Sequence, residues 1–138
     1  MGEPISSLQR KGPPPFDALE LELWLPRAVL YPRIDARIEA QRAAGLFEEV
    51  RALLDTGVPP DAPALTSIGY RQVLPALRGE ISAEEAVARL RRDTRRLVRH
   101  QETWWRRNER LRRIDLRRPD AIAAILAEIE THLQQRRA

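Results

Sequence analysis

The chain has 138 residues, of which 43% are apolar, enough for one domain of ordinary size or for part of a larger one. It contains no cysteine, which excludes disulfides, thiolate metal sites and a cysteine nucleophile. No apolar run reaches the roughly 18 residues that a membrane-spanning helix needs, and the first residues lack the apolar middle of a signal peptide. We therefore expect a cytoplasmic protein without membrane contact.

The positive charge is unevenly distributed along the chain. The net charge is +4, and all basic residues except Lys11 are arginines. Eleven arginines and five acidic residues lie between Ser82 and Arg113, so this segment is strongly basic and the remainder is slightly acidic. Because arginine binds phosphate oxygens bidentately, the asymmetry indicates a polyanionic partner for one face of the molecule.

The N-terminal part combines a linker pattern with a strand pattern. Residues 1–18 contain four prolines and two glycines without periodicity, which predicts a linker or the tail of an upstream segment. Residues 19–25 (LELELWL) alternate apolar and acidic side chains, the pattern of a β-strand. A single strand is not stable alone, so it either pairs within this chain or belongs to a sheet built by other residues.

Three helices are predicted next, over residues 26–45, 46–57 and 66–79. Pro32 is expected to kink or restart the first helix, and Pro75 to bend or break the third. The expected N-cap of the third helix is Thr66 or Ser67, because a hydroxyl can accept a hydrogen bond from a free N–H of the first turn.

The longest predicted helix begins at a capping box formed by Ser82 and Glu85. Small and apolar positions recur along it at alternating spacings of four and three, which predicts a core-facing seam extending to Asn108 and Leu111. A second short strand is predicted over residues 113–116. A final amphipathic helix from Pro119 presents an apolar face: Ile122, Ile125, Leu126, Ile129 and Leu133. The expected fold class is mainly α with two short strands.

Residues 95–107 (RRLVRHQETWWRR) place two adjacent tryptophans among five arginines. A row of arginines at helical spacings flanks the seam: Arg91, Arg95, Arg99 and Arg106. Trp104 lies on the seam and is expected in the core, whereas Trp105 lies about 100° further round the helix, where it can stack on an unpaired base. The alternative is a solvated face, in which arginines pair with acids four residues away and the tryptophans only pack.

A second polar group is the turn at residues 66–71 (TSIGYR). A glycine in a first helical turn costs about 1 kcal/mol in helix propensity, and Gly69 is tolerated there if a backbone or an anion approaches closely. Tyr70 and Arg71 add an aromatic ring and a cation at the same place. Two interpretations stay open: a ligand-binding turn, or a glycine that allows two helices to touch.

Several catalytic signatures do not occur in this sequence. It has no P-loop, no GxSxG and no HExxH motif, and its carboxylates form no persuasive catalytic pair. His100 has no second histidine at ligand spacing, so we expect it to pack or to face a phosphate rather than to bind a metal. The residues by themselves predict a helical module with a basic groove, not a self-sufficient enzyme.

Three motifs in the same order resemble the C-terminal half of the bacterial tRNA dimethylallyltransferase (tRNA isopentenyltransferase) family. They are LYPRIDARIEAQRAAGLFEEVRALLDTG, then the turn SIGYR, then TRRLVRHQETWWRR. The segment GEPISSLQ (2–9) also resembles a family segment. The similarity extends from Gly2 to about Asp115.

The resemblance implies a fold and a reaction. The fold is the helical C-terminal part of a P-loop, nucleoside-kinase-like α/β protein, with 1–18 as a linker and 19–138 as the tRNA-binding portion. The reaction transfers a dimethylallyl group from dimethylallyl diphosphate to N6 of adenosine 37 in tRNA, with Mg²⁺ and with the base extruded into a channel. The family's P-loop and general base are expected upstream, so no catalytic residue and no metal ligand is assigned here, and the chain alone is expected to be inactive.

The resemblance also implies residue roles. Arg33 and Arg37 match arginines near the diphosphate end of the channel. The positions expected to contact the tRNA anticodon stem-loop, bound by a monomer, are Gly69, Tyr70, Arg71, Arg95, Arg99, His100, Gln101, Thr103, Trp104, Trp105 and Arg106. The chain departs from the family where His100 follows Arg99 in place of Lys-Arg, and where Pro32 and Pro75 replace helix formers.

Two other functions remain possible on the sequence. One is a free-standing helical RNA-binding module without catalytic activity. The other is a helical scaffold whose basic face is merely solvated. Salt-dependent RNA binding separates both RNA-binding hypotheses from the scaffold, and prenyl transfer separates the enzyme from the module.

Overall fold

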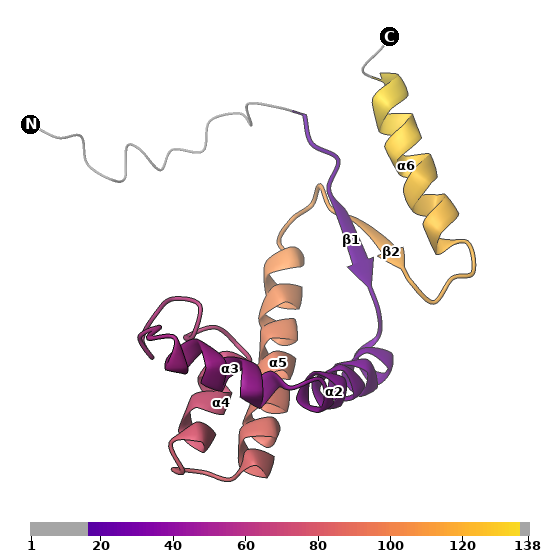
Figure 1. Ribbon diagram of the computed structural model, residues 1–138. Coiled ribbons are helices and arrows are strands. Elements are labelled where there is room, and N and C mark those ends of the chain that lie inside the picture. Colours follow the sequence, from indigo (N-terminus) through magenta and orange to yellow (C-terminus); the bar gives the residue numbers. More distant parts are fainter. Residues whose placement is uncertain (1–16, 136–138) are drawn as a thin grey trace, which may run out of the picture. The chain divides into compact units, whose positions relative to one another are not determined.

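A computed structural model describes residues 17–135 of the chain (Figure 1). The elements in chain order are β1 (Leu21–Trp24), α2 (Arg27–Ala43), α3 (Leu46–Asp55), α4 (Tyr70–Leu77), α5 (Ala83–Trp105), β2 (Arg112–Asp115) and α6 (Ala121–Gln135). The predicted fold class, mainly α with two short strands, is confirmed. The linker expected over residues 1–18 lies almost entirely outside the described residues. The chain divides into two compact units, one formed by residues 24–109 and one by the two flanking segments.

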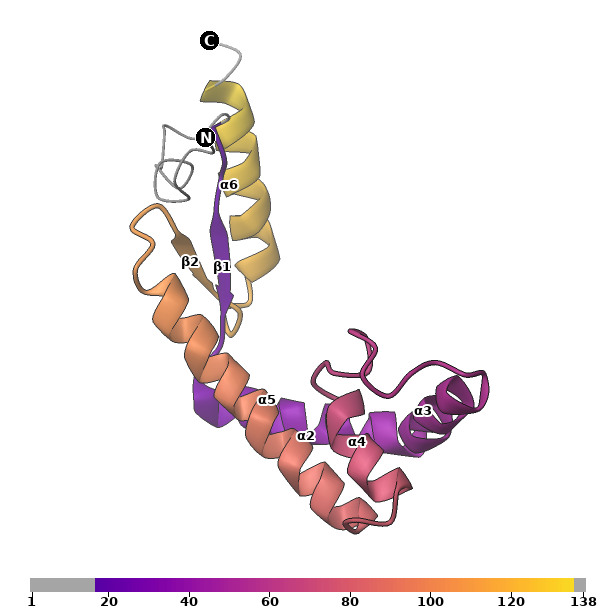
Figure 2. The same cartoon turned by 90° about the vertical axis from the view of Figure 1, so that its left-hand side faces the viewer.

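The unit of residues 24–109 is a four-helix arrangement in which α5 contacts both α2 and α4, and α3 packs against α2 and α4 (Figure 2). Its core is aliphatic and consists of Ile34, Ile38, Leu46, Val50, Leu65, Val73, Leu74, Val87 and Leu90. Ile38 and Val50 are at most 1% exposed. Because every helix contributes to this cluster, the unit closes its own hydrophobic core.

The predicted N-cap of α5 at Ser82 is confirmed, because Ser82 Oγ accepts a hydrogen bond of 3.0 Å from the Glu85 N–H, whereas the Glu85 side chain pairs with Arg89 and does not complete the predicted capping box. The predicted seam is buried only over its first half, from Ala86 to Thr94. Beyond that point Leu97 is 42% exposed and Trp104 is 66% exposed, so the prediction that Trp104 lies in the core is wrong.

The burial of this seam stops before the end of α5 because α2, the helix that packs against it, extends no further. The start of α2 is level with Glu102, where the Arg27 guanidinium pairs with the Glu102 carboxylate. The last turn of α5 therefore extends past the neighbour that buries the earlier turns. The helix itself stops at Trp105, so the predicted seam positions Asn108 and Leu111 lie outside it.

The two internal prolines do not interrupt their helices. Helix α2 continues through Pro32 and α4 through Pro75, so the predicted restart and break do not occur. A proline inside a helix removes one backbone hydrogen bond. Buried neighbours in the core, Ile34 beside the first and Leu74 beside the second, offset that loss through packing.

The start of α4 differs from the prediction. The helix begins at Tyr70 with Gly69 as its N-cap, so the expected cap at Thr66 or Ser67 is wrong. Both hydroxyls instead donate to carbonyl groups of the preceding turn, at 2.8 and 2.6 Å. Gly69 has a φ of 113°, a region that only glycine adopts without strain.

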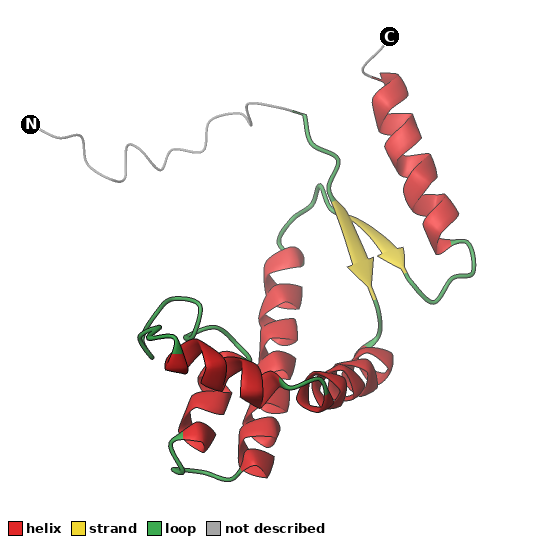
Figure 3. Ribbon diagram, viewed as in Figure 1, coloured by secondary structure: helices red, strands yellow, loops and turns green. Residues whose placement is uncertain are grey.

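The second unit pairs β1 with β2 in a two-stranded parallel sheet (Figure 3). The strand predicted from LELELWL thus pairs within the chain, the first of the two alternatives. The side chain of Arg113 on β2 donates to the nearly buried Glu22 carboxylate on β1 at 2.6 Å. In the turn after β2, hydrogen bonds from Arg117 lower the pKa of Asp115 to about 2.

Helix α6 packs against β2 but leaves most of its predicted apolar face exposed. Ala121 is buried and Ile125 is half-buried. The exposed aliphatic side chains of this helix recur at helical spacing: Ile122, Leu126, Ile129 and Leu133. An aliphatic stripe of this size is typical of an interface rather than of a solvated face.

Candidate functional site

Two hollows lie beside the contact between α2 and α5 in the four-helix unit. The larger of the two has a volume of about 410 Å³ and is lined by Leu30, Arg33, Ile34, Arg37, Thr94, Leu97, Val98 and Gln101. Arg37 and Thr94 also line an adjoining hollow that extends past Gln41 to Ser67, Gly69 and Tyr70. We call these two hollows together the α2–α5 groove. It brings together five of the residues singled out in the sequence: Arg33, Arg37, Gly69, Tyr70 and Gln101.

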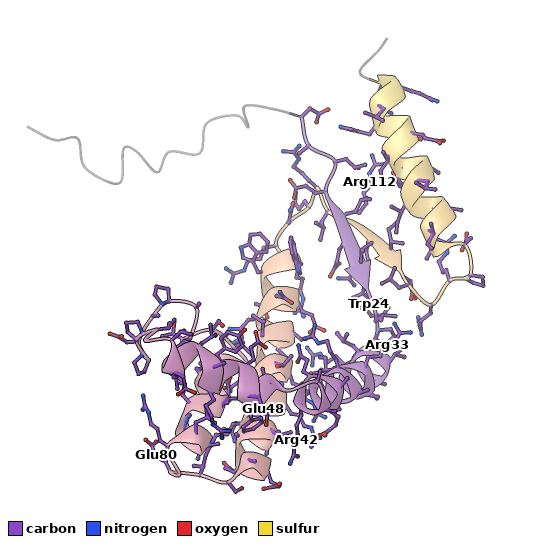
Figure 4. The ribbon with its side chains drawn as sticks, in the orientation of Figure 1. Trp24, Arg33, Arg42, Glu48, Glu80 and Arg112 are labelled. Atoms are coloured by element: carbon purple, nitrogen blue, oxygen red, sulfur yellow. The ribbon has the colours of Figure 1, made fainter. Side chains whose placement is uncertain are left out.

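The cations of the α2–α5 groove are Arg33 and Arg37, four residues apart on α2 and therefore on the same helical face (Figure 4 labels Arg33). Among the residues that the structure describes, neither guanidinium has an ion pair or a hydrogen bond. Both side chains are exposed. Two unpaired planar cations beside an apolar floor form a suitable site for an anion that carries an apolar tail.

The far end of the groove is the turn at Gly69 and Tyr70. The Tyr70 hydroxyl donates to Glu49 Oε1 on α3 at 2.5 Å. This hydrogen bond to a carboxylate raises the pKa of Tyr70, because the carboxylate stabilises the protonated phenol. The ring of Tyr70 is thereby held between α3 and the groove, half-buried.

Two of the four arginines on the other side of the α2–α5 contact are neutralised by acidic side chains. Arg91 pairs with Glu39, and Arg95 pairs with Asp35 at 2.5 Å while lying 5.1 Å from the centre of the Tyr31 ring. A separate hollow there is lined by Asp35, Ala88, Arg91, Arg92, Arg95 and Arg99. Within the described residues Arg92 and Arg99 form no salt bridge, although the charge of Arg92 helps to lower the pKa of the adjacent Asp93. This face therefore offers fewer free cations than the arginine row suggests.

The two tryptophans lie at the exposed end of α5. Their ring centres are 4.4 Å apart with an angle of 65° between the planes, an edge-to-face pair. Trp104 is 66% exposed and lines a shallow hollow with His100, Thr103 and Arg107, whereas Trp105 is half-buried. Of the two rings, Trp104 offers the larger free surface.

The remaining expected residues, among them Arg71 and Arg106, do not line any of the four hollows described above. Arg71 is exposed and donates to Asp93 Oδ2 at 3.4 Å. Arg106 follows the last residue of α5 and is exposed. The structure thus spreads the candidate residues over the groove, the second arginine hollow and the end of α5.

Three polar residues with a role in this site were missed from the sequence. Arg27 and Glu102 join the start of α2 to the end of α5, and Gln72 lies buried between α4 and α5. Arg27 and Glu102 are 75 residues apart in the chain, and Gln72 is 21 residues from its partner Asp93, so no local sequence pattern predicts these contacts. The one available signal was Gln72 itself, a polar residue on the apolar face of a short helix.

Within residues 17–135, no group of three or more histidine, cysteine, aspartate or glutamate side chains is arranged to hold a metal ion. The same residues include no helix that is long and apolar enough to cross a membrane. The polar groups that line the α2–α5 groove belong to two arginines, two glutamines, Thr94, Ser67 and Tyr70, and they lie beside aliphatic side chains.

Comparison with known proteins identifies one family by both its sequence profile and its individual members. The sequence profile of a family described as "IPP transferase" matches residues 1–108. The chain is 43% identical over 134 residues to a tRNA dimethylallyltransferase of Thermomicrobium roseum, and 49% identical over 106 residues to one of Chloroflexus aurantiacus. These alignments cover 97% and 77% of the chain, but only 41% and 36% of the two relatives.

Solved structures resemble this fold as well. A tRNA delta(2)-isopentenylpyrophosphate transferase from Staphylococcus epidermidis superposes with a TM-score of 0.78 at 30% identity, over 88% of this chain and 39% of that one. A full-length tRNA isopentenylpyrophosphate transferase from Bacillus halodurans superposes with a TM-score of 0.77 at 26% identity, over 97% and 45%. The chain spans about two fifths of the length of the relatives it matches.

Proposed function

Because this chain belongs to the IPP transferase family, we propose that it is the tRNA-facing portion of a tRNA dimethylallyltransferase. The observation that carries the proposal is the α2–α5 groove, in which two unpaired arginines lead to the turn at Gly69. The family's named substrates require a site for a diphosphate with an apolar tail and a basic surface for RNA. The groove and the exposed arginines of α5 supply groups of those two kinds.

In this proposal each part of the site has its own ligand. Arg33 and Arg37 bind the diphosphate bidentately, and the aliphatic floor formed by Leu30 and Leu97 receives the dimethylallyl group. Gln101, at the same end of the groove, is placed to donate to or accept from the edge of the extruded adenine. The prenyl group would then pass to N6 of adenosine 37 as diphosphate leaves.

The phosphates of the anticodon stem are assigned to groups on and near α5, all exposed except the half-buried Arg95: Arg71, Arg95, Arg99, His100, Thr103 and Arg106. Arg95 already has Asp35 as a partner, so Arg99 and Arg106 are the stronger candidates. His100 offers at most two N–H donors to a phosphate, whereas an arginine offers five, so phosphate binding at this position is weaker than an arginine would give.

Magnesium is implied by the resemblance, but the described residues do not fit it. The protein groups that line the α2–α5 groove are guanidinium, amide and hydroxyl groups, and none of them is a carboxylate, the protein group that usually holds Mg²⁺. No step is therefore assigned to the metal on these residues. Chemistry is proposed to require the part of the relatives that this chain does not span.

The alternative, an RNA-binding module without chemistry, is favoured by one observation: the four-helix unit closes its own core. Both functions predict RNA binding with several phosphate contacts. About four such contacts make log K fall against log salt with a slope near −3. A measured slope near zero on an anticodon stem-loop RNA would leave only the solvated-scaffold interpretation.

Prenyl transfer separates the two RNA-binding functions. We expect this chain, mixed with the remaining portion of the Thermomicrobium roseum relative, to transfer a labelled dimethylallyl group to an anticodon stem-loop containing adenosine 37. The chain alone is expected to be inactive in the same assay. Binding without transfer in the mixture would favour the module.

The tryptophan pair gives a further prediction. Stacking of one base contributes roughly 1–3 kcal/mol, so loss of the stacking ring is expected to weaken RNA binding by at least about fivefold. Trp105 was predicted from the sequence and Trp104 is the more exposed ring, so Trp104→Ala and Trp105→Ala should be compared by fluorescence anisotropy. Leu116→Ala, which removes an exposed apolar side chain away from the groove and from α5, is the control. Unchanged affinity in both tryptophan variants would contradict stacking.

A further inference from the structure

Gln72 is the most deeply buried polar residue of the four-helix unit, with 4% of its surface exposed. Both ends of its amide are engaged. Oε1 accepts a hydrogen bond of 2.9 Å from the Gly69 N–H, and Nε2 donates one of 2.7 Å to Asp93 Oδ2 on α5. The amide therefore connects the N-cap of α4 to the middle of α5.

The chemistry of the two partners fixes the orientation of this amide. The Gly69 N–H needs an acceptor and the Asp93 carboxylate needs a donor, so only one placement of the amide oxygen and nitrogen satisfies both. Asp93 has its pKa lowered, first by the hydrogen bond from Gln72 and then by the charge of Arg71. A carboxylate at position 72 could not donate to Asp93 and would repel it.

The same bridge affects the groups that the turn presents. Gly69 lies at a φ of 113°, and Tyr70 and Arg71 follow it directly. Arg71 reaches Asp93 only at 3.4 Å and has 48% of its side chain exposed, so its guanidinium can exchange this weak pair for another anion. The hydrogen bond from Gln72 to Asp93, at 2.7 Å, is therefore the shorter of the two and the one that holds the Asp93 carboxylate in place.

We propose that Gln72 is a positioning residue, which together with Asp93 fixes the Gly69–Arg71 turn against α5 so that Tyr70 and Arg71 meet the RNA in one geometry. The RNA part of this inference rests on the proposed function. The structural part, the coupling of the turn to α5 through one amide, stands independently of it.

The test uses the full chain with Gln72→Glu, which keeps the size of the side chain, removes the donor to Asp93 and places a second negative charge beside that carboxylate. Loss of one hydrogen bond is expected to speed hydrogen exchange of the Gly69 amide roughly fivefold to tenfold, and to weaken RNA binding by a similar factor. Gln134→Glu adds the same charge on the exposed side of α6 and is expected to change neither quantity.

Rescue makes the test specific. In the double variant Gln72→Glu with Asp93→Asn, the new amide donates to the new carboxylate, and that carboxylate still accepts from the Gly69 N–H. We expect the double variant to recover most of the exchange protection and of the RNA affinity. If Gln72→Glu does not fold, Asp93→Ala, which leaves the Gln72 amide without its acceptor, is measured instead and is expected to speed exchange in the same way.

The outcomes separate the two proposals. Unchanged exchange at Gly69 in the single variant, or no recovery in the double variant, overturns the positioning role. Faster exchange with unchanged RNA affinity overturns its connection to RNA. If the unmodified chain binds no RNA, the proposed function fails, and the exchange data still decide whether Gln72 holds the turn.

Discussion

Replacing Ile38 with alanine is expected to lower the free energy of unfolding by about 3–4 kcal/mol. Ile38 is 1% exposed and lies on α2 at the centre of the cluster shared with α3, α4 and α5. Removing three buried carbon atoms forfeits their transfer free energy and leaves a cavity that the surrounding helices fill only partly. Urea denaturation followed by circular dichroism measures the effect.

The matched control is Ile122→Ala, the same chemical change on α6. Ile122 is 74% exposed, so its loss is expected to change the free energy of unfolding by no more than about 0.5 kcal/mol. Similar losses in the two variants would contradict the assignment of the core to the four-helix unit. A large loss in Ile122→Ala alone would indicate that the α6 stripe is covered in solution.

The second large effect concerns the α2–α5 groove. The double variant Arg33→Ala with Arg37→Ala is expected to weaken binding of inorganic diphosphate about thirtyfold, since each exposed charge-assisted contact contributes roughly 1 kcal/mol. Isothermal titration calorimetry with diphosphate as the probe measures this. Neither guanidinium has a partner among the described residues, so their removal breaks no ion pair within the helices.

A second double variant, measured with both diphosphate and RNA, distinguishes the diphosphate site from the RNA surface. Arg99→Ala with Arg106→Ala is expected to leave diphosphate binding unchanged and to reduce the magnitude of the salt slope for RNA by about 1.5, since two phosphate contacts are lost. Arg51→Ala, an exposed arginine of α3 away from the groove, serves as the charge control. Equal effects of all three variants on both ligands would mean that only net charge matters.

The sequence by itself determined the features that depend on neighbouring residues. The start of α5 follows from Ser82, because the capping hydroxyl and the Glu85 N–H that donates to it lie within one turn. The two strands and α6 follow from the local periodicity of apolar side chains. Family membership likewise follows from short motifs read in order, and the profile match over residues 1–108 confirms it.

Only the tertiary structure decided which faces are covered and which charges are free. The periodic pattern of apolar residues predicts that one side of α5 is apolar. Those side chains are buried only where another helix packs against that side. Helix α2 begins level with Glu102, which leaves Trp104 exposed. Likewise, Arg33 is free while Arg95 is neutralised, because Asp35 lies on the side of α2 that faces Arg95. Helical spacing orders side chains around one axis, whereas packing between helices selects their partners from residues tens of positions away.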